Sequence, residues 1–242
     1  MRKFPKHVQH KRAKQVQRLT GRLHQQLVDI VVPRILGVRK ADPEVETWDD
    51  AIERIAGAYG EAAGIGAKAL SDYGFTYDEA TLGKMDAAVA AAVSKASNYV
   101  HRNLGNYGDQ LRLQLDHEDI DYGDAVHNLS SRLELYAEPV WNVFQNVKRI
   151  GYEDQGGGLL LIWSLDPASN HCDDCPEIAD GNPYTTSAGD NPLPTWPGDG
   201  DTQCETRCNC SVEPEEQSWN DIMAPVEEQA NADAEQAAES FT

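Results

Sequence analysis

The sequence has no long hydrophobic run, and its first residues are not apolar. No stretch of about 18 apolar residues occurs in the 242-residue chain, so we expect nothing to cross a membrane. Met1 to Lys6 lead into further charged residues rather than into the apolar stretch of a secretory signal. We therefore expect synthesis in a reducing cytosol, where cysteines bind metal rather than form disulfides.

Motifs of the common enzyme classes are also missing. The chain has no His-Glu-x-x-His pair, no Gly-x-Ser-x-Gly elbow and no phosphate-binding loop. The deaminase pattern needs a His-x-Glu upstream of its Cys-x2-Cys, and that pairing is absent. His117 lies in the acidic stretch 116–119, which we interpret as a solvated loop rather than a metal site. The sequence therefore predicts a protein that is not an enzyme.

Basic residues are scarce after the first 40 positions. Residues 1–40 hold 11 of the 21 Lys and Arg and one acid, Asp29, so their net charge is +10. The remaining residues hold 10 basic and 39 acidic side chains, a net charge of −29, which together give the total of −19. A basic arm on an acidic body suggests contact with nucleic acid or with an acidic protein surface. A solvated helix face is the alternative. The candidate contact residues are Lys11, Arg12, Lys14, Arg18 and Arg22.

The acidity of the body allows two interpretations. Carboxylate-rich surfaces keep proteins soluble where salt screens charges within a few ångströms, so a halophilic host is one explanation. An ordinary acidic protein is the other. The arm has no aromatic residues interleaved with its charges after Phe4, so binding to DNA would depend on phosphate attraction and weaken with salt.

Cysteine is absent from the first 171 residues and then occurs five times within 39 positions. Cys172 and Cys175 form a Cys-x2-Cys pair, and Cys204, Cys208 and Cys210 follow after a polar loop. Two close-spaced groups joined by a loop are typical of a tetrahedral structural Zn²⁺ site. We expect four of the five to bind, with Cys210 the least certain. His171 adjoins the first pair, and we interpret it as a neighbour of the site or as solvent-facing.

Amphipathic spacing predicts four helices, and therefore a mainly α fold. They cover about residues 16–32, 49–70, 82–100 and 128–150. Pro33 is expected to end the first, and Pro139 to kink or split the fourth near Glu138. The apolar seam of residues 82–100 suits a bundle core or self-association. Residues 105–128, rich in Gly, Asp and Asn, are predicted to be loops.

The cysteine-rich end is predicted to be a small module with a short strand or hairpin. Residues 159–165 form an apolar stretch that is too short for a helix and indicates a buried strand. Residues 180–201 are predicted to be a long loop whose ends metal ligation would hold together. The acidic tail after Pro214 is predicted to be a marginal helix or disordered, with Trp219, like Trp196, a weak candidate for an interface anchor.

Residues 133–214 resemble the carboxy-terminal region of phage head morphogenesis proteins similar to the F protein of phage Mu. The resemblance lies in a helix with Glu138, a short apolar strand with Trp163, the Cys-x2-Cys pair, a Gly-containing loop and the final Cys-x-Cys. Two features depart from the family pattern. The Arg that usually precedes the helix Glu closely is absent, and Cys204 stands where a His usually precedes the last cysteines.

The resemblance implies a minor head protein of a tailed virus, made in the host cytoplasm and located inside the capsid. Its implied partners are the portal protein, the major capsid protein and packaged DNA, and its implied role is head morphogenesis or genome delivery. A zinc-ribbon regulator that binds nucleic acid remains the alternative. We expect an α-rich α+β chain of four parts: a basic arm (1–40), a helical domain (41–150), a zinc-binding module (151–214) and an acidic tail (215–242).

Overall fold

A computed structural model describes residues 8–37, 45–166, 171–199, 201–203 and 208–239. The chain divides into two compact units. Residues 12–66 and 82–147 form one, here called the helical unit; residues 1–11, 67–81 and 148–242 form the other, here called the sheet unit. The expected four-part division of the chain stays a prediction. Within the described residues, no helix is long and apolar enough to span a membrane.

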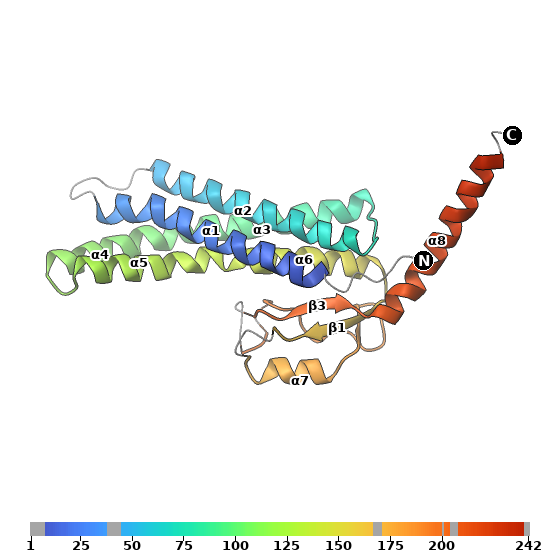
Figure 1. The fold of residues 1–242 in the computed structure, drawn as a ribbon. Helices are drawn as coiled ribbons and strands as arrows, with labels where there is room; N and C mark the ends of the chain where they lie inside the picture. The colour runs from blue at the N-terminus through green and yellow to red at the C-terminus, as the bar shows by residue number, and fades with distance from the viewer. Residues whose placement is uncertain (1–7, 38–44, 167–170, 200, 204–207, 240–242) are drawn as a thin grey trace. The chain divides into compact units, whose positions relative to one another are not determined.

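Most of the chain is helical, which confirms the α-rich fold with a small strand module (Figure 1). The first six helices are α1 (Val8–Leu36), α2 (Val45–Asp72), α3 (Glu79–Tyr99), α4 (Gly105–Asp116), α5 (Tyr122–Ala137) and α6 (Pro139–Asp154). A short π-helix, η1 (Val100–Leu104), joins α3 to α4. The predicted break at Pro139 is confirmed, because α5 ends at Ala137 and α6 begins at Pro139.

Apolar seams hold the helical unit together. The seam of α1 is buried at Val16, Leu19, Leu23 and Leu27, as its three- and four-residue spacing predicts. Polar contacts then fix how neighbouring helices meet. The Tyr59 hydroxyl of α2 donates to the Tyr136 carbonyl of α5 at 3.2 Å. His24 of α1 lies 3.0 Å from the Ser130 carbonyl of α5. These bonds fix α5 against both α1 and α2.

The prediction of loops at residues 105–128 is wrong. Helix α4 occupies residues 105–116, and α5 begins at Tyr122, where Asp121 caps it by accepting from the Asp124 amide at 2.8 Å. The glycines that favoured a loop serve packing instead. A Cβ on Gly108 would lie 2.9 Å from Ile35, so glycine lets α4 approach α1 closely. Arg112 of α4 adds a hydrogen bond between the same two helices, because its side chain donates to the Ile35 carbonyl of α1 at 2.8 Å.

The prediction that the first helix ends at Pro33 is wrong, because α1 continues to Leu36. The carbonyl of Pro33 accepts from the Gly37 amide at 2.8 Å, which closes a final turn after the proline. Val31 and Ile35 are both fully buried, so the apolar seam runs past the proline. Pro33 cannot donate a backbone hydrogen bond to the preceding turn, but the turn that follows it is still helical.

The sheet unit contains a three-stranded antiparallel sheet. Its strands are β1 (Leu160–Ser164), β2 (Tyr184–Thr185) and β3 (Ser211–Pro214), in the order β2-β1-β3. The predicted strand at 159–165 is therefore the central strand of the sheet. The short helix α7 (Asp174–Asp180) packs against β1 (Figure 1). Asn182 extends the pairing: its side chain accepts from the Trp163 amide at 2.7 Å and donates to the Trp163 carbonyl at 2.9 Å.

The acidic tail forms helix α8 (Glu216–Glu239). Of the two predicted alternatives, the helical one is confirmed, and the first turns of α8 are anchored rather than marginal. Trp219 and Met223 are buried, and the Trp219 indole donates to the Tyr73 carbonyl at 2.6 Å. Trp196 is also buried and stacks against Tyr152. Both tryptophans are therefore core residues of the sheet unit, not exposed interface anchors.

Candidate metal centre

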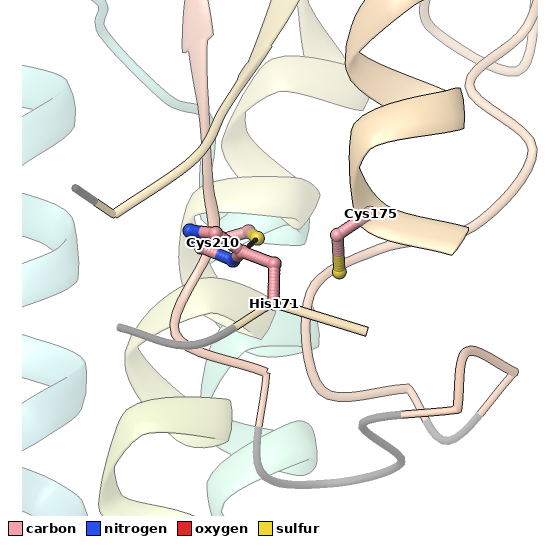
Figure 2. A group of neighbouring side chains, drawn as sticks. All are labelled: His171, Cys175 and Cys210. Carbon is pink, nitrogen blue, oxygen red and sulfur yellow. Dashed lines mark hydrogen bonds between the residues drawn. The ribbon is translucent and has the colours of Figure 1, made fainter. Parts of the chain in front are cut away.

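Three segments of the sheet unit bring their Cys and His side chains together. His171 lies just before α7, Cys175 in the first turn of α7, and Cys210 directly before β3 (Figure 2). Their ligand atoms all lie within 4.8 Å of one another. Cys175 and Cys210 are buried, and His171 is half-buried. Because β3 pairs with β1 and α7 packs against β1, the central strand holds these two cysteines in place.

Two further cysteines adjoin this triad. The sulfur of Cys172 lies 3.5 Å from that of Cys175, and the sulfur of Cys208 lies 3.7 Å from that of Cys175. The sulfur of Cys210 lies 3.6 Å from Nδ1 of His171. With Zn–S bonds of about 2.3 Å and Zn–N bonds of about 2.0–2.1 Å, tetrahedral edges are about 3.8 Å for S–S and about 3.6 Å for S–N. The observed separations are close to these edges.

The ring of His171 is oriented for ligation. Its Nε2 lies 2.7 Å from the Asp166 carbonyl oxygen, which can only accept, so Nε2 carries the proton and donates. Nδ1, the nitrogen nearest Cys210, is then left with its lone pair. Metal-binding histidines commonly donate their second ring nitrogen in this way, because the bond fixes tautomer and ring orientation.

Hydrogen bonds hold part of the loop between the two cysteine groups beside α7. Asp174, the neighbour of Cys175, accepts from the Gln203 amide at 2.8 Å and from the Gln203 side chain at 3.1 Å. Gln203 immediately precedes Cys204 in the sequence. This contact holds Gln203, the last described residue before the second cysteine group, beside Asp174. Closure of the loop by a metal stays a prediction. Cys204 itself lies outside the described residues.

Thiol neighbours raise the pKa of Cys210. The hydrogen bond to Cys208 contributes most, followed by burial of the sulfur and then by the nearby charge of Cys208. Several thiolates crowded in a buried place repel one another, so without a cation they keep their protons. A bound cation removes that penalty, and thiols then lose protons as they ligate. This group of described side chains can therefore hold a metal ion.

The structure brings Cys172, Cys175, Cys208 and Cys210 into one cluster. Cys210, given as the least certain ligand, belongs to the group of three whose ligand atoms all lie within 4.8 Å of one another. His171, expected to be a neighbour of the site or solvent-facing, belongs to the same group. Sequence reasoning missed it because a lone His beside a Cys-x2-Cys has no spacing rule. The partner that orients it is the backbone carbonyl of Asp166, which no side-chain pattern reveals.

The predicted contact residues of the arm lie on one helix. Lys11, Lys14, Arg18 and Arg22 are exposed on α1, and Arg12 is half-buried. Their spacing of three, four and four residues puts the first four on one face. Arg22 forms an ion pair with Glu61 at 2.7 Å, and Arg12 donates to Gln15 at 3.0 Å. The face is thus a basic stripe, partly neutralised at its Arg22 end.

Comparisons of this chain with protein-family models, with curated proteins and with solved structures find no match.

Proposed function

We propose that this chain is a minor head protein of a tailed virus whose sheet unit is stabilised by structural zinc. The observation that carries the proposal is the cluster of His171, Cys175 and Cys210 beside a small sheet. The resemblance of residues 133–214 to the Mu F-like family supports the viral role. The order of a Trp-containing strand, a Cys-x2-Cys and a final Cys-x-Cys is found here in a single compact unit. The proposed role is structural, and no reaction is assigned to the chain.

Zinc fits the donor set better than other metals. Thiolates with an imidazole select Zn²⁺ or iron–sulfur clusters, and the separations near 3.6 Å suit a single tetrahedral ion. We assign three ligands to His171, Cys175 and Cys210. The fourth is Cys172 or Cys208, whose sulfurs lie 3.5 and 3.7 Å from that of Cys175. Four protein ligands leave no open position for water, so the ion would stabilise the fold rather than activate a substrate.

The metal assignment is tested by replacing single ligands in the full chain. His171→Ala, Cys175→Ser and Cys210→Ser should each weaken Co²⁺ binding by at least tenfold and change the thiolate-to-cobalt absorption. Cys172→Ser and Cys208→Ser identify the fourth ligand, because only one of them should have a comparable effect. His117→Ala is the matched control, since His117 is an exposed histidine at the end of α4. Equal binding by His171→Ala and the wild type would remove His171 from the ligand set.

We propose packaged DNA as the partner of the basic stripe on α1. Exposed Lys and Arg on one helix face attract phosphates without reading sequence, and each neutralised phosphate steepens the salt dependence by about 0.9 in a log–log plot. An acidic protein surface is the competing partner. The portal and major capsid proteins, and self-association through residues 82–100, stay part of the proposal. For the last, Leu82 is 47% exposed, whereas Met85, Ala96 and Val100 of the same seam are buried, as a bundle core requires.

The decisive test of the role is quantitative mass spectrometry of purified virus particles, both full and after genome release. A minor head protein should be present in a few copies in full particles, and its loss on release would indicate ejection with the DNA. Absence from intact particles would contradict the proposal. Salt-sensitive DNA binding by the free protein, combined with that absence, would favour the zinc-ribbon regulator.

A further inference from the structure

A lysine and a glutamate are buried together in the sheet unit, next to strand β3. Lys148 of α6 is 1% exposed, and Glu213 of β3 is 7% exposed. The Lys148 ammonium donates to the Glu213 carboxylate oxygen Oε1 and, at 2.9 Å, to the Val212 carbonyl. One side chain of α6 thus holds both the backbone and the side chain of β3.

The other carboxylate oxygen of Glu213 is also satisfied. The hydroxyls of Tyr73 and Tyr152 donate to Oε2 at 2.8 and 3.2 Å. Burial raises the pKa of both tyrosines most, and the negative charge of Glu213 and these bonds raise it further. A buried ion pair adds little net stability compared with apolar residues of similar shape, but in some proteins it specifies one arrangement of its partners. Such a group is therefore better suited to specifying position than to supplying stability.

The position that this group specifies is the register of β3. Val212 pairs with Trp163, and Glu213 pairs with Ile162 of β1. A slip by one residue would move β3 by about 3.3 Å and turn each side chain to the opposite face. Lys148 and both tyrosines would then lose the Glu213 carboxylate as their acceptor in the interior. Each of those losses is costly, so the alternative register is strongly disfavoured.

The same register places two of the metal-site cysteines. Cys210 directly precedes β3, and Cys208 lies two residues before Cys210. Metal–sulfur bonds tolerate displacements of only about 0.2 Å, far less than a one-residue slip. We propose that the Lys148–Glu213 pair is a positioning element that holds Cys208 and Cys210 ready for the metal before it binds. This inference rests on the proposed metal site.

The test uses the full chain with Lys148→Met and Glu213→Gln combined. This double variant removes both charges but leaves an acceptor for the two tyrosine hydroxyls. Its matched control is Arg149→Met with Asp199→Asn, which removes the exposed ion pair formed by the next residue of α6 at 2.8 Å. We expect the double variant to bind Co²⁺ at least tenfold more weakly, with a broadened cobalt absorption band, and the control to match the wild type.

Several results would overturn the inference. Wild-type Co²⁺ affinity and an unchanged absorption band in the double variant would contradict the positioning role alone. A wild type that takes up no Co²⁺ would contradict the metal site as well. If the double variant fails to fold, amide exchange on the metal-free wild type decides. Protection of the Glu213 and Glu215 amides, which face β1, is expected without metal, and rapid exchange there would refute a preformed strand.

Discussion

The interiors of the two units of this protein differ in how many polar side chains they bury. Among the described residues of the helical unit, Gln145 is the one buried polar or charged side chain. The sheet unit buries Lys148, Glu213 and several hydroxyl side chains, namely Thr81, Thr185, Thr186, Thr195, Thr202, Ser211 and Ser218. The helical unit is thus held mainly by apolar seams, whereas the sheet unit adds buried polar bonds and a cysteine cluster to its apolar core.

This difference follows from how much apolar surface each unit can bury. Long amphipathic helices bury a residue at every third or fourth position, and the effect grows with helix length. Strands of five, two and four residues offer few such positions. Small folds with little core typically need metal or other cross-links. We therefore expect metal removal and core substitutions to affect the stability of the two units differently.

Metal removal should have the largest effect, and it should be confined to the sheet unit. Structural zinc contributes about 10–16 kcal/mol to folding in small peptides, so chelation should cost the sheet unit much of its stability. Amide exchange with and without a chelator measures this directly. The amides of β1 and α7 should lose protection, whereas those of α1 and α5 should keep theirs. An equal loss of amide protection in both units would contradict a metal effect confined to the sheet unit.

A cavity in the helical unit should have the next largest effect. Leu133 of α5 is fully buried, so Leu133→Ala should lower the free energy of unfolding by about 2–5 kcal/mol. Chemical denaturation measures the loss. Co²⁺ affinity should stay at the wild-type value, because the metal ligands belong to the other unit. A variant that loses metal binding without unfolding would contradict the separation of roles.

Loss of one polar bond pair in the sheet unit should cost less. Asn182→Ala leaves the amide and carbonyl of Trp163 without their side-chain partner, which should cost about 1–3 kcal/mol. Asn191→Ala is a suitable control, because its side chain makes an exposed bond to the Pro183 carbonyl. Thermal unfolding of both variants checks the difference. Equal melting temperatures would show that the bonds from Asn182 to Trp163 do not stabilise the sheet unit.

The smallest effect is expected on the surface of the helical unit. Arg22 and Glu61 are about half exposed, and solvent screens such pairs, so Arg22→Met should change stability by about 0–1 kcal/mol. Arg18→Met should have no larger effect on stability but should weaken DNA binding if the stripe contacts phosphates. Binding measured over a range of salt concentrations separates the two. An unchanged salt slope for Arg18→Met would remove this residue from the contact.

The sequence predicts elements well where one periodic signal dominates. The seam of α1, the break at Pro139 and strand β1 are all of this kind. Helix α4 was missed because Gly105 and Gly108 favour a loop locally, whereas the need for close approach to Ile35 exists only in the packed unit. The cysteine spacing pointed to the cluster, but not to the ring of His171. The bonds of Lys148 and Glu213 join residues 65 positions apart, which no local pattern reveals.

The most direct test of the account is native mass spectrometry of the full chain, purified under reducing conditions without added metal. The account predicts one Zn²⁺ for each chain, retained in the wild type and lost from Cys175→Ser and Cys210→Ser. A folded wild type that stays metal-free after exposure to equimolar zinc would contradict it. The cluster of cysteines beside the small sheet would then need another explanation.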